Sequence, residues 1–132
     1  TFGTPVAADR DAADARRGAL AMMESVAEWN TARAARGETP IRAAFGVHSG
    51  AAVLGDIGAN RLEFAVIGDT VNVASRVEAL TRPLGATLAA TDEAVRRARE
   101  GDGCGTLLED LVRRESQEIR GLDRRVDVWT LG

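Results

Sequence analysis

The chain has 132 residues, a formal net charge of -3 and one cysteine. This length suits one domain with a core of its own, and we expect a single, partial domain over residues 1–132. The slightly acidic charge argues against a broad nucleic-acid-binding surface, which needs a concentrated basic excess. Cys104 alone cannot form an internal disulfide, and no apolar run is long enough to span a bilayer. We therefore expect a cytoplasmic segment without membrane contact.

The first half of the chain predicts a long helix followed by a hairpin of strands. Residues 8–36 are rich in Ala, Arg and Glu and contain no proline. Their apolar residues recur at helical spacing and are expected to face the core: Ala19, Met22, Met23, Val26 and Trp29. Residues 41–54 predict one strand, and residues 61–67 predict its partner across a turn at 55–60. The small residues Gly46, Ser49 and Gly50 indicate a bulge or a close approach by another backbone.

The second half predicts two helices and three strands. A helix is expected to begin with Asp69 as its N-cap and to end near Leu80. A short strand at 86–90 leads to a helix capped by Thr91 or Asp92, then to a loop at 101–105. Strands at 111–119 and 126–131 finish the chain. This order predicts an α+β sandwich with helices over one face of a mainly antiparallel sheet.

The change from strand to helix at residues 68–76 holds the strongest functional signal. Helical spacing puts the apolar residues that follow Gly68 on one stripe, and it puts Asn72 and Arg76 together beside that stripe. An amide and a guanidinium placed in this way can position and neutralise an oxyanion or a phosphate. The residues alone also allow a plainer interpretation, in which Arg76 is solvated and Asn72 serves a helix turn.

The same segment, Gly-Asp-Thr-Val-Asn-Val-Ala-Ser-Arg, resembles a motif of the class III adenylyl and guanylyl cyclases. Further matches lie on both sides of this segment, in the order in which the family has them, at residues 45–50, 55–58, 119–121 and 126–129. The resemblance implies the ferredoxin-like sandwich of nucleotidyl cyclases, with the N-terminal strands of that fold absent from these residues. It also implies conversion of a nucleoside triphosphate to the 3′,5′-cyclic nucleotide and pyrophosphate.

In that family the active site forms between two subunits arranged head to tail, so the resemblance implies a homodimer. Asn72 would orient the ribose, Arg76 would stabilise charge on the α-phosphate, and Asp69 and Thr70 would contact the substrate. The expected cofactor is Mg²⁺ or Mn²⁺. The family's two metal-binding aspartates lie upstream of these motifs, so we assign no metal ligand here. We expect the segment alone to be inactive and to fold poorly.

Two positions depart from the family pattern. Ala65 stands where adenylyl cyclases often have Asp or Thr and guanylyl cyclases Cys, so its side chain cannot read the purine edge; we favour ATP and leave GTP open. Leu122 is nearest to the place of a phosphate-binding Lys. Arg120 or Arg124 would replace that Lys, although either could be an exposed loop charge. His48 is predicted to be structural.

Two other functions remain open at this stage. A catalytically inactive cyclase-like module could serve only for dimerisation or nucleotide sensing. A small α+β scaffold outside the family, such as an effector-binding domain, would leave the spacing of Asn72 and Arg76 unexplained.

Overall fold

A computed structural model describes residues 1–4, 6–57, 63–102 and 109–132. The helices and strands, in chain order, are α1 (Asp11–Ala35), β1 (Phe45–Val47), β2 (Val53–Ile57), β3 (Glu63–Ile67), α2 (Asp69–Leu84), β4 (Leu88–Thr91), α3 (Asp92–Asp102), β5 (Val112–Gln117) and β6 (Val126–Leu131).

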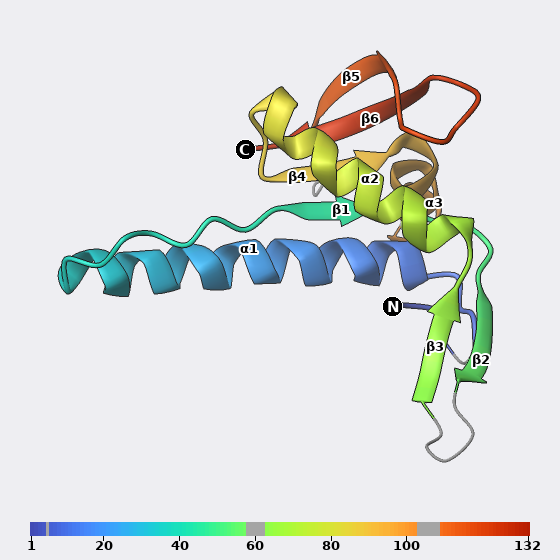
Figure 1. Ribbon diagram of the computed structural model, residues 1–132, viewed down its shortest axis with the longest axis horizontal. Coiled ribbons are helices and arrows are strands. Elements are labelled where there is room, and N and C mark those ends of the chain that lie inside the picture. Colours follow the sequence, from blue (N-terminus) through green and yellow to red (C-terminus); the bar gives the residue numbers. More distant parts are fainter. Residues whose placement is uncertain (5, 58–62, 103–108) are drawn as a thin grey trace.

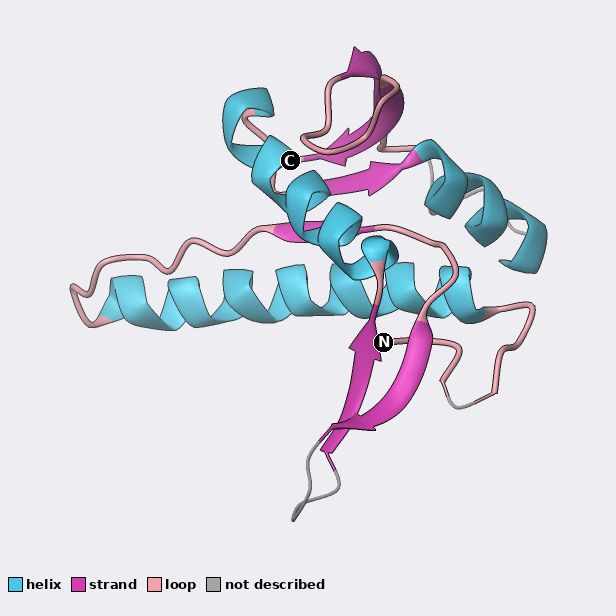
Figure 2. Ribbon diagram, turned by 45° about the vertical axis from the view of Figure 1, so that its right-hand side comes forward, coloured by secondary structure: helices cyan, strands magenta, loops and turns pink. Residues whose placement is uncertain are grey.

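The strands form a four-stranded sheet and a separate hairpin. The sheet has the order β1–β4–β6–β5, in which β1 pairs with β4 in parallel and the other pairs are antiparallel. The antiparallel hairpin β2–β3 projects away from the sheet (Figure 1). Figure 2 shows that β3 leads directly into α2, so the hairpin and this helix are joined by a very short connection. The predicted α+β class and its mainly antiparallel sheet are confirmed.

Helices cover both faces of the sheet, which corrects the prediction that they cover one. All four residues of β4 are buried. Leu88 and Ala90 pack in a cluster with residues of α1 and α3, whereas Ala89 packs against Val73 and Val77 of α2. In Figure 1, α2 crosses in front of the strands and α3 lies behind them. The physical reason is that β4 begins with three consecutive apolar residues, whose side chains alternate between the two faces of the sheet and need cover on each side.

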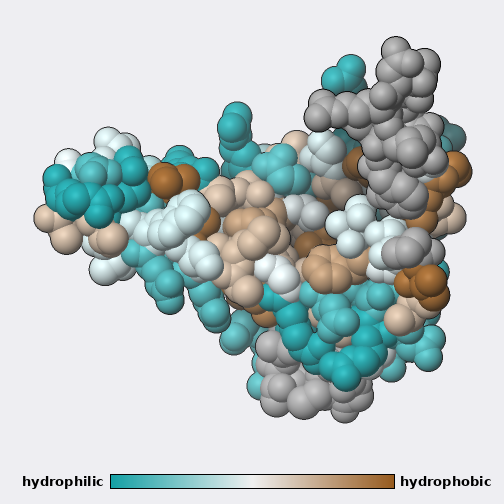
Figure 3. Space-filling model, turned by 90° about the horizontal axis from the view of Figure 1, so that it is seen from below, coloured by the Kyte–Doolittle hydropathy of each residue, from teal (hydrophilic) through white to brown (hydrophobic). Residues whose placement is uncertain are grey.

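The predicted first helix is confirmed as α1, but its expected core face is partly wrong. Ala19 is buried and Met23 packs against the core, whereas Met22 is 51% exposed and Trp29 is 61% exposed. The C-terminal half of α1 extends beyond the sheet (Figure 1). Seen from below, apolar residues lie at the surface of this projecting part (Figure 3). Helical periodicity indicates which residues share a face, but it does not tell how far the sheet reaches along it.

The single strand predicted at 41–54 is wrong, because the structure divides it between two sheets. β1 belongs to the main sheet, β2 belongs to the hairpin, and residues 48–52 connect them. The predicted close approach is confirmed at Gly46, where a Cβ would overlap the Ala74 carbonyl oxygen and meet the backbone of Glu78. The hairpin itself is confirmed, with Val53 opposite Ile67. Its predicted turn lies partly outside the described residues.

The remaining predicted elements are present, but the expected end of α2 near Leu80 is wrong, because the helix continues to Leu84 and includes Pro83. Thr91 caps α3, because its Oγ1 accepts a hydrogen bond from the Ala94 N–H at 3.4 Å. Asp92 instead accepts a hydrogen bond from the Trp129 indole N–H at 2.8 Å. The loop predicted at 101–105 is wrong for its first two residues, which complete α3, and its other residues lie outside those described.

Candidate active site

The start of α2 is set by Gly68. This residue has φ 144° and ψ 172°, a backbone conformation that favours glycine, and it is the N-cap of the helix. The prediction that Asp69 is the N-cap is therefore wrong: Asp69 is the first helical residue, and no side-chain hydrogen bond caps the helix. The exposed Asp69 carboxylate still suits the positive end of the helix dipole.

Thr70 holds the first turn of α2 to the segment that connects β1 and β2. Its hydroxyl donates a hydrogen bond to the carbonyl oxygen of Ala51. A Cβ on the neighbouring Gly50 would lie 2.7 Å from Thr70 Oγ1, so the segment passes very close to the helix here. The Thr70 hydroxyl thus has a structural partner, and its predicted contact with substrate stays a prediction.

Asn72 and Arg76 lie on the same flank of α2, one helical turn apart. The helix buries Val73 and Val77 against the sheet and leaves Asn72 exposed and Arg76 half-buried. The guanidinium of Arg76 lies against the backbone of Gly121, where a Cβ would clash with Nη1 and lie 3.0 Å from Cζ. A residue of α2 and a residue of the β5–β6 connection therefore meet at this point.

A β-turn in the β5–β6 connection places Gly121 beside Arg76. The N–H of Leu122 donates a hydrogen bond to the carbonyl oxygen of Ile119 at 3.0 Å, and Gly121 has φ 82°, as type II turns require at their third residue. Ile119 is 2% exposed and belongs to the same core cluster as Val73 and Val77. Sequence reasoning noted Gly121 only within a family match, although a glycine in a turn after a strand is itself a signal of positive φ.

The other predicted site residues fall in two places. Arg120 and Arg124 are exposed side chains on the β5–β6 connection that also carries Gly121. Ala65 lies in β3, paired with Gly55 across the hairpin. The structure therefore brings the β5–β6 connection to Arg76, while Ala65 belongs to the separate hairpin.

His48 makes a structural contact. Its Nδ1 lies 2.9 Å from Thr91 Oγ1, which also accepts from the Ala94 N–H. The Thr91 hydroxyl has one proton and two lone pairs, so it can make both of these hydrogen bonds with either ring tautomer of His48. Burial lowers the pKa of His48, and the negative charge of Glu93 opposes this shift only in part.

No group of three or more His, Cys, Asp or Glu side chains among the described residues is arranged to hold a metal ion.

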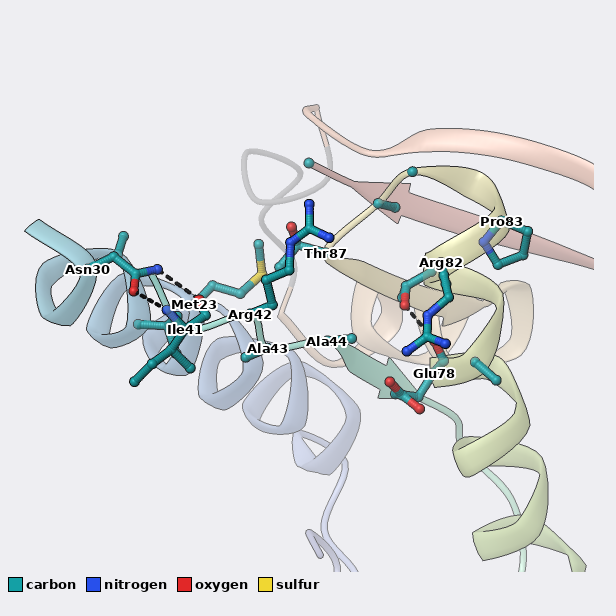
Figure 4. A pocket seen from close by; sticks show the side chains of 17 residues that line it. Met23, Asn30, Ile41, Arg42, Ala43, Ala44, Glu78, Arg82, Pro83 and Thr87 are labelled. Carbon is teal, nitrogen blue, oxygen red and sulfur yellow. Dashed lines mark hydrogen bonds between the residues drawn. The ribbon is translucent and has the colours of Figure 1, made fainter. Parts of the chain in front are cut away.

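One pocket, of about 940 Å³, is lined by neither Asn72 nor Arg76. It opens between the second half of α1, residues 41–44 and the end of α2 (Figure 4). Asn30 joins α1 to residue 41 in the wall of this pocket: its side-chain amide N–H donates to the Ile41 carbonyl oxygen at 2.9 Å, and its amide oxygen accepts from the Ile41 N–H at 2.7 Å. A second pocket, of about 440 Å³, lies beside β1 and is lined in part by Thr70 and Val71 of α2.

The model of the adenylate and guanylate cyclase catalytic domain family matches residues 1–130, and the chain belongs to this family. It is 40% identical over 100 residues to adenylate cyclase 1 of Rhizobium meliloti, covering 75% of this chain and 15% of that protein. It is 30% identical over 116 residues to an adenylate cyclase of Anabaena cylindrica, covering 84% of this chain and 22% of that protein.

The fold is similar to the crystal structure of the guanylyl cyclase Cya2, with a TM-score of 0.75 and 24% sequence identity. That match covers 98% of this chain and 61% of the solved one. The chain thus spans less than a quarter of the curated relatives named above and under two thirds of the solved domain. Among the helices that the structure describes, none has the length and apolar character needed to cross a bilayer.

Proposed function

We propose that the protein carrying this chain converts a nucleoside triphosphate to the 3′,5′-cyclic nucleotide and pyrophosphate. The ribose 3′-oxygen gives its proton to solvent water and attacks the α-phosphorus, and the bond from that phosphorus to the oxygen bridging the α- and β-phosphates breaks, so that pyrophosphate leaves with the bonding electron pair. The observation that carries the proposal is the pairing of Asn72 with a half-buried Arg76 on one flank of α2, in a chain of the cyclase family.

Arg76 is proposed as the group that stabilises the transition state. Its guanidinium would present a planar fork of N–H donors to the non-bridging oxygens of the α-phosphate. Asn72 offers both a donor and an acceptor, which suits the ribose hydroxyl and ring oxygens. Removing a comparable oxyanion donor costs about 3–4 kcal/mol, which corresponds to about 10²–10³ in kcat.

ATP is the proposed substrate, with GTP as the alternative. The two relatives named above are adenylate cyclases, which supports ATP. Ala65 has no polar side-chain atom, so we propose that base discrimination is weak or comes from groups other than this side chain. Asp69 and Thr70 at the start of α2 are proposed to contact the substrate, and Arg120 and Arg124 to bind the triphosphate.

The site is proposed to form in a head-to-tail homodimer that acts in cytoplasmic signalling. Mg²⁺ or Mn²⁺ is the proposed cofactor, and its ligands are expected upstream of the residues of this chain.

The test measures cyclic nucleotide and pyrophosphate formed by the full-length protein from ATP or GTP with Mg²⁺ or Mn²⁺. Arg76→Ala should lower kcat by about 10²–10³ while the melting temperature stays close to that of the unmodified protein. Arg82→Ala is the matched control, since Arg82 is an exposed arginine on the last turn of the same helix. If the unmodified protein makes no cyclic nucleotide from either substrate, the inactive-module alternative replaces this proposal.

A further inference from the structure

The turn at residues 119–122 is anchored to the same helix face that carries Arg76. Ile119 is buried among Val73 and Val77 of α2, and Leu122 packs against that cluster. The hydrogen bond from the Leu122 N–H to the Ile119 carbonyl oxygen closes the turn between these two anchors. Gly121 lies between these two anchors, so its position relative to α2 is fixed.

The contact between Gly121 and Arg76 involves a rigid group and a flexible one. A Cβ at residue 121 would meet Nη1, Cζ and Nη2 of Arg76, which are the far end of a long side chain. The turn is held by buried apolar residues, whereas the guanidinium can move by rotation about its side-chain bonds. A methyl group at this position would thus displace the guanidinium, while the buried anchors on either side hold the turn against the strain of a side chain at positive φ.

We infer that Gly121 is a positioning residue for Arg76: its bare backbone forms the surface on which the guanidinium rests in the orientation used for catalysis. This inference rests on the proposed function, because Arg76 is the group that acts on the substrate there. An unsupported arginine samples many rotamers, so the supporting turn reduces the freedom lost when the guanidinium meets the phosphate.

The inference predicts a loss of turnover in addition to the small loss of stability that a side chain at positive φ causes, with little change in substrate affinity. Displacing a catalytic group by about 1 Å can cost about 10²-fold in rate. We expect Gly121→Ala to lower kcat about 10- to 100-fold, with KM for ATP changed less than about threefold, since Arg76 acts mainly on charge that develops in the transition state.

Gly37→Ala provides the matched control in the full-length protein. Gly37 has φ 70°, close to the φ 82° of Gly121, so both substitutions place a side chain at a positive φ. A Cβ on Gly37 would meet nothing within 4 Å. Both variants should lose a few degrees of melting temperature, and only Gly121→Ala should lose kcat. Equal kcat in the two variants, or failure of Gly121→Ala alone to fold, would overturn the inference.

A double variant tests whether the effect passes through Arg76. In an Arg76→Ala background there is no guanidinium to displace, so adding Gly121→Ala should change kcat less than about twofold. The same fold-loss as in the unmodified background would overturn the inference.

An NMR measurement separates this inference from the proposed function. The ¹⁵Nε–H resonance of Arg76 should shift in Gly121→Ala and stay in place in Gly37→Ala. That result would support the contact between Gly121 and Arg76 even if the protein makes no cyclic nucleotide. The absence of cyclic nucleotide would refute only the proposed function. An unshifted resonance in Gly121→Ala would overturn the inference.

Discussion

The imidazole Nδ1 of His48 lies 2.9 Å from the hydroxyl oxygen of Thr91, a residue 43 positions later in the chain. This contact joins the segment after β1 to the start of α3. On its other side the same segment is held by the hydrogen bond from the Thr70 hydroxyl to the Ala51 carbonyl oxygen. The connection at 48–52 is thus tied to the first residues of two helices, one of which carries Asn72 and Arg76.

The His48 contact predicts a loss of stability in mild acid. Burial holds the pKa of His48 below its usual value near 6.5, and the Glu93 charge opposes this only in part. The folded state therefore takes up the proton less readily than the unfolded state. Consequently, the free energy of unfolding should be constant above about pH 7 and should fall as the pH drops through 6.5 and the lower pKa of the folded state. The slope should be shallow because the ring is only half-buried.

Urea titrations of the full-length protein between pH 7.5 and 5.0 would measure this slope. His48→Gln keeps a polar side chain but cannot titrate, so its difference from the unmodified protein isolates the histidine. Carboxylates such as Asp127, whose pKa is lowered by the Ser116 N–H and by Arg113, titrate in more acidic solution and contribute little in this range. Parallel curves for the two proteins would show that His48 does not carry the effect.

A side chain at Gly46 would clash with backbone atoms, whereas one at Gly121 would clash with the end of a side chain. A Cβ on Gly46 would meet backbone atoms of Ala74 and Glu78, which belong to a packed helix and cannot rotate away. Gly46→Ala should therefore lower the free energy of unfolding by about 1–3 kcal/mol, the usual cost of overpacking. Gly55→Ala in β2 is the control, because a Cβ there would meet nothing within 4 Å. Urea unfolding of both variants is the measurement, and an equal loss would contradict the close packing of β1 on α2.

The sequence predicted the elements whose signals are local. Thr91 is a capping residue at the start of α3. At Gly68 the spacing of the apolar residues changes from that of a strand to that of a helix, which marks the end of the hairpin and the start of α2. Local signals also place Asn72 and Arg76 on one flank, since that follows from the helix alone.

Other features depend on contacts between distant segments and could not be predicted in this way. Residues 41–54 contain two strands instead of one: Gly46 in β1 packs closely against α2, and β2 pairs with β3 in a separate sheet. Trp29 is exposed because α1 is longer than the sheet that it covers, which no periodicity reveals. The contact of Arg76 with Gly121 needs a turn that folds back from β5 onto α2.

The position of Arg120 predicts a role in binding rather than in turnover. Arg120 is exposed and precedes Gly121, so it lies on the turn that reaches Arg76. If it binds the triphosphate, Arg120→Ala should raise KM for ATP about fivefold, the factor that corresponds to the roughly 1 kcal/mol of an exposed ion pair. Its kcat should stay the same, because the charge of the triphosphate tail is present before and during the reaction.

Arg114→Ala is the control for this prediction, since Arg114 is an exposed arginine of β5. Steady-state kinetics at low and high salt would provide a second readout. The difference in KM between Arg120→Ala and the unmodified protein should shrink at high ionic strength, because salt screens an exposed charge. If Arg124→Ala raises KM and Arg120→Ala does not, the triphosphate is bound by the later part of the β5–β6 connection.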